Sequence, residues 1–268
     1  MTVRVHAVPL TSGLDPQDNR RAAVAAVDRA AEDGARLVVL PEYAAAFDPR
    51  GVGPEHAEPL DGPFTAALQE AAARTGVLVV AGMLLPGSVP ERGVNAVVAV
   101  GGGGVVAVYR KVHLYDAFGH RESDRLEPGA AGDPAVVVTL GGLHLGLMTC
   151  YDLRFPESAR RLVDAGATAL VVPAAWAAGE HKADHWRTLL RARAIENTSF
   201  VVGAAQHGRG VTGTCLVVDP VGVVVGESTS GTAPAVGDLD PGLVAAVRHR
   251  NPSLLNRRYD VVPRGTRS

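Results

Sequence analysis

Short apolar runs rich in valine alternate along the chain with alanine-rich stretches in which apolar residues recur at helical spacing. Runs that are apolar at nearly every position are typical of strands in a sheet that is covered on both faces. We therefore predict strands over residues 2–8, 36–40, 77–84, 94–100, 105–110, 143–149, 169–172, 200–205, 215–219, 221–226 and 235–239. The glycine run at 101–104 is predicted to join two of these strands as a hairpin.

The alanine-rich stretches predict helices. Asp15 is placed to cap a helix over residues 15–33, with Pro16 in its first turn and Gly34 at its end. Further helices are predicted over residues 64–75, about 156–164 and about 183–196, and a short helix follows residue 239. Residues 111–132 form a long polar loop with little periodicity, and loops of that length inside a compact domain are usually functional or disordered.

The order of these elements predicts the fold class. Hairpins interrupt the strand–helix–strand units, which favours an α/β fold of two sheets packed face to face, each covered by helices on its outer face. No break in composition and no linker divides the chain, so we expect a single domain over residues 1–268, with a C-terminal tail from about 248 to 268. The similarity of residues 37–41 (Leu-Val-Val-Leu-Pro) to residues 170–173 (Leu-Val-Val-Pro) hints at two related halves.

Charge and composition exclude several classes of partner. The 268 residues carry a formal net charge of -2, without the broad positive footprint of a nucleic-acid-binding protein. The apolar runs are shorter than the ~20 residues that a membrane span requires, and the N-terminus alternates like a strand and lacks the features of a signal peptide. We therefore expect a cytoplasmic protein with no nucleic-acid or membrane partner. Two cysteines without metal-ligand spacing indicate neither a disulfide framework nor a metal site, and we expect no cofactor.

Lysine is rare in this chain. It occurs only at positions 111 and 182, although lysine and arginine together number 26. Arginine and lysine are not interchangeable where a compact ammonium is needed. Each lysine is therefore a candidate for a specific role.

Three residues with reactive side chains follow directly on predicted strands. Cys150 ends the strand at 143–149 and begins a polar turn, a position that lifts a side chain off the carboxyl end of a sheet. Glu42 lies just past the strand at 36–40, and Lys111 follows the strand at 105–110. A nucleophilic thiol needs a base and a group that stabilises an oxyanion, and these three residues would supply all of them. Taken singly, each is more often a buried thiol, an exposed carboxylate or a surface ion pair.

The identity of the base stays open on this reasoning alone. Histidine is the usual partner of a nucleophilic cysteine. His144 lies on the same strand as Cys150 but roughly 20 Å away if that strand is extended. His113, in the long loop, therefore stands beside Glu42 as a candidate. The second cysteine, Cys215, lies inside an apolar strand and is expected in the core.

Three segments with this order and spacing resemble the signature segments of the nitrilase superfamily, the carbon–nitrogen hydrolases. They are Pro-Glu-Tyr at 41–43, Tyr-Arg-Lys-Val-His-Leu-Tyr-Asp at 109–116 and Gly-Leu-Met-Thr-Cys-Tyr-Asp-Leu-Arg-Phe-Pro-Glu at 146–157. The resemblance continues through residues 191–197, 218–222 and 257–259, and so covers essentially the whole chain. It implies a four-layer α-β-β-α sandwich, in agreement with the layers predicted above.

The resemblance also implies roles for individual residues. Glu42 would be the general base and Cys150 the nucleophile. Lys111 and the Tyr151 backbone N–H would stabilise the oxyanion of the tetrahedral intermediate. These roles describe a Glu-Lys-Cys triad that works through a thioester.

A second glutamate of the family's long loop matches Glu122. The resemblance implies that this residue orients Lys111 and the substrate amide. Glu127 is the nearby alternative, but the Pro-Gly pair that follows it favours the alignment with Glu122.

Two further residues are candidates for substrate binding. Arg154 lies four residues after Cys150 and is predicted either to bind a substrate carboxylate or to pair with Glu157. Trp176, just past a predicted strand, either lines the pocket or caps the core.

The leading interpretation is an amidase that hydrolyses a small linear amide to a carboxylate and ammonia. The segment around the cysteine is most similar to the branch of the superfamily that acts on ω-amides of dicarboxylates or on deaminated glutathione. N-carbamoyl hydrolysis and nitrile hydrolysis are alternatives, and acyl or amide transfer and a non-enzymatic binding module are alternatives of another class. From the family's habit we also expect a homodimer or larger assembly, with the basic tail at 248–258 packed across the subunit boundary.

Overall fold

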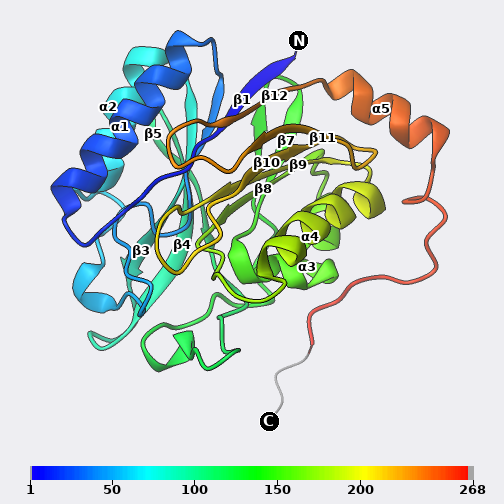
Figure 1. The fold of residues 1–268 in the computed structure, drawn as a ribbon. Helices are drawn as coiled ribbons and strands as arrows, with labels where there is room; N and C mark the ends of the chain where they lie inside the picture. Colours follow the sequence, from blue (N-terminus) through cyan, green and yellow to red (C-terminus); the bar gives the residue numbers. More distant parts are fainter. Residues whose placement is uncertain (1, 265–268) are drawn as a thin grey trace.

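The computed structural model describes residues 2–264 and arranges their strands in two six-stranded sheets (Figure 1). The strands of the first sheet are, in spatial order, β12 (Ala235–Leu239), β1 (Val3–Ala7), β2 (Leu37–Val39), β3 (Leu78–Pro86), β4 (Gly93–Gly101) and β5 (Gly104–Arg110). Those of the second sheet are β11 (Val224–Ser228), β10 (Cys215–Val218), β9 (Phe200–Ala205), β8 (Ala169–Ala174), β7 (Leu143–Leu147) and β6 (Val137–Leu140).

Helices cover the outer face of each sheet, and the two sheets pack directly on each other (Figure 1). Side chains of α1 (Pro16–Glu32) and α2 (Pro63–Thr75) share a core with the first sheet. Side chains of α3 (Pro156–Asp164) and α4 (Lys182–Asn197) share a core with the second. Because the strands alternate their side chains between the two faces, the remaining apolar residues form a third core between the sheets. The predicted four-layer α-β-β-α sandwich is confirmed.

The two sheets have the same strand pattern. In the first, β1, β2 and β3 run parallel, and β12 pairs antiparallel with β1 on one side. On the other side β4 pairs antiparallel with β3, and β5 pairs antiparallel with β4. In the second, β7, β8 and β9 run parallel, and β6 pairs antiparallel with β7 on one side. On the other side β10 pairs antiparallel with β9, and β11 pairs antiparallel with β10. β2 and β8, which carry the similar Leu-Val-Val segments, therefore occupy equivalent places.

The structure differs from the predicted elements in a few places. β6 was not predicted, because it is a short edge strand directly after a polar loop. β11 begins at Val224, because Oδ1 of Asp219 accepts the N–H groups of Val221 and Val223 and holds them in a turn. The last helix, α5 (Pro241–Arg250), contains the first basic residues of the predicted tail, since cations are favourable in the last turn of a helix. The end of that tail, 265–268, lies outside the described residues.

No helix within residues 2–264 is both long enough and apolar enough to cross a membrane.

Candidate active site

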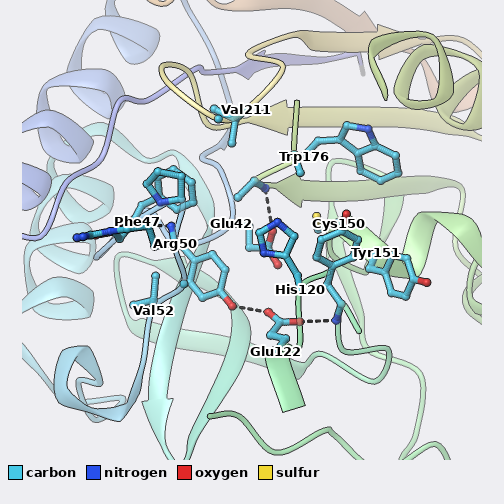
Figure 2. Close-up of a pocket in the computed structure, with 18 of the residues that line it drawn as sticks. Glu42, Phe47, Arg50, Val52, His120, Glu122, Cys150, Tyr151, Trp176 and Val211 are labelled. Atoms are coloured by element: carbon cyan, nitrogen blue, oxygen red, sulfur yellow. Dashed lines mark hydrogen bonds and ion pairs between the residues drawn. The ribbon is translucent and has the colours of Figure 1, made fainter. Parts of the chain in front are cut away.

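Glu42, Lys111 and Cys150 follow β2, β5 and β7, and all three line one pocket of about 390 Å³. Figure 2 shows Glu42 and Cys150 in this pocket. The other site residues predicted from the sequence line the same pocket: Glu122, Tyr151, Arg154 and Trp176. The structure thus brings together every predicted site residue.

Lys111 lies in a buried ion cluster. Its Nζ is 2.8 Å from Oε1 of Glu42 and 2.9 Å from Oε2 of Glu122. Only 2% of the Lys111 side chain and 1% of the Glu42 side chain are exposed. A buried charge is costly unless it is paired and hydrogen-bonded, so the ammonium and the two carboxylates stabilise one another as a set.

Neutral donors from other elements hold the two carboxylates in place. Nδ2 of Asn95, on β4, donates to Oε1 of Glu42 over 2.8 Å and to Oε1 of Glu122 over 3.1 Å. The Tyr43 hydroxyl donates to Glu122, and the Tyr115 backbone N–H donates to the same carboxylate over 2.7 Å (Figure 2). Glu122 is therefore fixed from three directions besides Lys111.

The cluster sets the charge of its members. Burial alone would lower the pKa of Lys111, but the Glu122 and Glu42 carboxylates outweigh it and raise that pKa well above its usual value. Burial opposes the charge of Glu122 too, yet Lys111 and the Tyr43 hydroxyl hold its pKa below its usual value. Burial and the Glu122 carboxylate raise the pKa of Tyr43, so its hydroxyl stays a donor. Lys111 and Glu122 are thus both charged at neutral pH.

Glu42 is presented by a tight turn at the end of β2. The next residue, Tyr43, has a left-handed backbone with φ of 59°, a conformation that costs a non-glycine residue roughly 1–3 kcal/mol. β3 passes so close that a Cβ on Gly82 would lie 2.4 Å from the Glu42 Cα, so glycine is required there. The Ala175 N–H, just after β8, donates to Oε2 of Glu42 over 2.8 Å. The turn, β3 and β8 together fix this carboxylate.

Cys150 begins a 3₁₀ turn, Cys150–Arg154, directly after β7. Its φ of 45° is also left-handed, and strain of this kind clusters at functional sites. Burial and the Glu42 carboxylate raise the pKa of the Cys150 thiol well above its usual value. The thiol is therefore protonated in the resting protein and needs a base before it can act as a nucleophile.

His113, the alternative base, faces a different part of the molecule. Its Nδ1 lies 2.8 Å from Oδ1 of Asp152, and its ring stacks on Phe155 with 3.8 Å between centroids. His113 and Phe155 line a second cavity, of about 750 Å³, and neither lines the pocket of Cys150. The geometry therefore favours Glu42 as the base.

Glu127, the alternative to Glu122, lies apart from the ion cluster. It accepts hydrogen bonds from the backbone N–H and the hydroxyl of Ser88. The carboxylate beside Lys111 is that of Glu122.

Arg154 and Trp176 lie against each other in the pocket wall. The Arg154 guanidinium carbon is 4.9 Å from the centroid of the Trp176 ring. Arg154 forms no ion pair with Glu157 or with any other carboxylate of residues 2–264. Trp176 is only 3% exposed and packs on Trp186, yet it also lines the pocket. It therefore caps the core and lines the pocket at the same time.

The sequence reasoning gave no role in the site to three residues of this region: Asn95, Tyr43 and Lys182. Asn95 carried a signal, because an amide inside an apolar strand needs hydrogen-bond partners when it is buried. Lys182, the second lysine, was singled out for its rarity but given no role.

The pocket holds the groups that covalent attack on a carbonyl carbon needs. They are a thiol, a carboxylate able to take its proton, and an ammonium able to stabilise negative charge on the attacked oxygen. No group of three or more His, Cys, Asp or Glu side chains that could hold a metal ion occurs in the part of the chain that the structure describes.

Known proteins are similar to this chain in sequence and in fold. Residues 4–249 match the family described as carbon-nitrogen hydrolase. The deaminated glutathione amidase of Escherichia coli O157:H7 is 39% identical over 233 residues, which are 86% of this chain and 88% of that protein. The C. elegans NitFhit structure aligns with a TM-score of 0.86 and 30% identity, over 97% of this chain and 66% of that one.

An amidase from Nesterenkonia sp. AN1 is also similar. A mutant of that amidase, which shows the result of Michael addition of acrylamide at its active-site cysteine, aligns with a TM-score of 0.75 and 31% identity. The alignment covers 94% of this chain and 99% of that one.

Fold and relatives together define an enzyme that hydrolyses amides. The chain belongs to the carbon–nitrogen hydrolase family, within the nitrilase superfamily. The family resemblance drawn from the sequence is confirmed.

Proposed function

We propose that this enzyme hydrolyses a small linear carboxamide to a carboxylate and ammonia, through a thioester on Cys150. The observation that carries the proposal is the shared pocket of the Cys150 thiol, the Glu42 carboxylate and the Lys111 ammonium, with Glu122 holding Lys111 from the other side. The Lys111 ammonium is charged and the Cys150 thiol is protonated at rest, as these two roles require.

The first half of the reaction forms the thioester. Glu42 takes the thiol proton, and the Cys150 sulfur bonds to the carbonyl carbon, whose oxygen gains the electron pair. Lys111 and the Tyr151 backbone N–H, which has no acceptor among the described residues, stabilise this oxyanion. Glu42 then gives its proton to the leaving nitrogen, the carbon–nitrogen bond breaks, and ammonia departs. Losing one such oxyanion donor typically costs about 3–4 kcal/mol of barrier.

The second half returns the enzyme to its starting state. Glu42 takes a proton from a water molecule, and the resulting hydroxide attacks the thioester carbon. The carbon–sulfur bond breaks, and the Cys150 sulfur recovers its proton from Glu42. The product leaves as a carboxylic acid, which gives its proton to the solvent and becomes the carboxylate. One water is consumed for each amide, and no oxidant or reductant is required.

Two features of the relatives support the hydrolysis of an amide at a cysteine nucleophile. Several similar proteins are named deaminated glutathione amidase, and one of them is 39% identical to this chain. In the Nesterenkonia amidase the active-site cysteine is the residue to which acrylamide adds. Cys150, at a strained turn in the pocket, is the candidate for the same role here.

The position of Arg154 supports a substrate that has a carboxylate at some distance from the scissile amide. Its guanidinium lines the pocket without a carboxylate partner in residues 2–264. A guanidinium binds a carboxylate through two parallel hydrogen bonds, which orients the ligand as well as holding it.

Ammonia release tests the proposed function. Purified enzyme is incubated with a panel of linear amides, and ammonia and carboxylate are measured together. We expect equal amounts of both, and mass spectrometry of quenched enzyme should find the acyl group on Cys150. Carbon dioxide beside ammonia would indicate a carbamoyl substrate, product formed only with an added amine would indicate transfer, and no product and no acyl-enzyme would indicate a binding module.

We also propose that the enzyme forms a homodimer or larger assembly and works in the cytoplasm. The tail after α5 exposes large apolar side chains, with Leu255 85% and Tyr259 88% exposed, and a second copy would cover them. A reducing compartment suits a nucleophile that must stay a thiol. Light scattering that finds only monomer at micromolar concentration would contradict the assembly.

A further inference from the structure

Two cations in the pocket have no carboxylate partner among residues 2–264. Every other lysine or arginine that lines the pocket forms an ion pair: Arg50, Lys111, Arg121 and Arg125. In the described part of the chain, neither Arg154 nor Lys182 does so. The pocket therefore carries two positive charges that nothing in residues 2–264 neutralises.

These two cations lie close together. The Lys182 Nζ is 3.3 Å from the centroid of the Phe118 ring, and the Arg154 guanidinium carbon is 5.8 Å from the same centroid. The Lys182 Nζ donates to the Tyr115 hydroxyl over 3.0 Å, which positions the ammonium without neutralising it. Burial and the neighbouring Arg154 both lower the pKa of Lys182.

The placement of Lys182 is unfavourable for the protein alone. It is the first residue of α4, where the helix already presents partial positive charge. It is only 7% exposed and lies beside a second cation. Nε of Arg154 is buried and has no hydrogen-bond partner among the described residues. Local conflicts of this kind are expected at functional sites, where a ligand relieves them.

We propose that Arg154 and Lys182 form a site for two anionic groups on the acyl arm of the substrate. The inference rests on the proposed amide hydrolysis. Because the leaving ammonia carries no further substituent, every charged group of the substrate lies on its acyl part. Since both cations lie against one ring, Phe118, the two anionic groups belong on the same side of the scissile bond. Arg154 takes one carboxylate with its planar fork, and Lys182 takes the second as a compact point charge. The substrate class is thus a monoamide that retains two carboxylates.

Three amides with the same five-carbon chain test this inference. Pentanamide has no carboxylate, glutaramate has one, and the terminal monoamide of 3-carboxyglutarate has two. We expect kcat/KM for the dicarboxylate to exceed that for glutaramate by about tenfold or more, the size of one charged hydrogen bond. In Lys182→Met, which keeps the length and apolar contacts of the side chain, this ratio should fall to about one. Lys182→Arg, which keeps the charge, should restore part of it.

The matched control is Arg50→Gln, because Arg50 also lines the pocket but is paired with Asp48. In this variant the ratio of kcat/KM for the dicarboxylate to kcat/KM for glutaramate should equal that of the unmutated enzyme. Equal kcat/KM for the dicarboxylate and glutaramate in the unmutated enzyme would overturn the inference, and so would a ratio that Lys182→Met leaves unchanged. Thermal unfolding of each variant checks that the fold is retained.

Calorimetry with the product acids tests the pair of cations without turnover. Propane-1,2,3-tricarboxylate should bind more tightly than glutarate to the unmutated enzyme, and Lys182→Met should remove that difference. If no amide is hydrolysed while the acids follow this order, the proposed function fails and the anion site stands. If amides are hydrolysed while the acids bind equally, the anion site fails and the proposed function stands.

Discussion

The Tyr109 hydroxyl donates a hydrogen bond to Oδ2 of Asp152 over 2.7 Å and joins two of the strand ends that carry the site. Tyr109 lies two residues before Lys111, and Asp152 lies two residues after Cys150. Asp152 is fully buried and also accepts the backbone N–H of Thr149 over 3.0 Å. This one carboxylate therefore ties the turn that presents the thiol to the strand that presents the ammonium.

Tyr109→Phe removes this connection while keeping the ring. We expect kcat to fall about tenfold with little change in KM, because the reacting groups lose alignment while substrate contacts stay. The free energy of unfolding should fall by about 1–3 kcal/mol, because a buried acceptor loses a donor. Steady-state kinetics and urea unfolding measure the two effects. Tyr259→Phe, at an 88% exposed position, is the control. An unchanged kcat in Tyr109→Phe would show that the bond serves stability alone.

The two cysteines should differ sharply in reactivity. Cys150→Ala should abolish turnover without unfolding the protein, whereas Cys215→Ala should keep turnover nearly intact. Cys215 is the first residue of β10 and is fully buried, and burial raises the pKa of its thiol to about 12. Iodoacetamide followed by peptide mass spectrometry locates the reactive thiol. Inactivation that maps to Cys215 would contradict the assignment of the site.

Lys111→Arg should damage activity nearly as much as Lys111→Ala. The Lys111 ammonium fits between two carboxylates at 2.8 and 2.9 Å in a buried position, and a guanidinium is larger and planar. We expect both variants to lose about 100-fold or more in kcat/KM, the cost of losing an oxyanion donor. Arg50→Lys, at an exposed ion pair, should be nearly silent. Substantial activity in Lys111→Arg would mean that any cation suffices there.

The layers of the fold could be predicted because the local sequence dictates them. The segments 200–205 and 235–239 are apolar or small at nearly every position, and the structure gives strands with these same bounds. Asp15 caps α1 by accepting the N–H groups of Gln17 and Asp18, as a side chain of this type does before a helix. The family resemblance then supplied the site residues, through the segments on which they lie.

The contacts within the site could not be predicted in the same way. Asn95 meets Glu42 and Glu122 only because β4, the turn after β2 and the long loop converge in space. The same holds for Lys182, which reaches the pocket from the start of α4 and meets Phe118 of the long loop. The residues in these contacts are far apart in sequence, and no local pattern of apolar and polar residues predicts such contacts.

Acid should destabilise the enzyme partly through Glu122. Above its usual pKa of 4.5, Glu122 is ionised in both the folded and the unfolded chain, and its stabilising contribution is complete. As the pH falls below that value toward the lower folded pKa, the unfolded chain binds the proton first and stability is lost. Urea unfolding at a series of pH values should therefore show a steeper acid loss in the unmutated enzyme than in Glu122→Gln. Parallel curves for the two proteins would mean that folding leaves the pKa of Glu122 unchanged.

The last prediction concerns the carboxylate that Arg154 is proposed to bind. Because a bidentate guanidinium–carboxylate contact is charge-assisted, we expect the enzyme to prefer glutaramate over pentanamide by about tenfold or more in kcat/KM. Arg154→Ala should bring this ratio close to one, and Arg154→Lys should restore only part of it, since a lysine lacks the planar fork. Glu157→Gln is a matched control, because no ion pair between Arg154 and Glu157 exists within residues 2–264. The control should keep the ratio of the unmutated enzyme. Equal kcat/KM for the charged and the neutral amide in the unmutated enzyme would remove Arg154 from substrate binding and leave its stacking on Trp176 as its role.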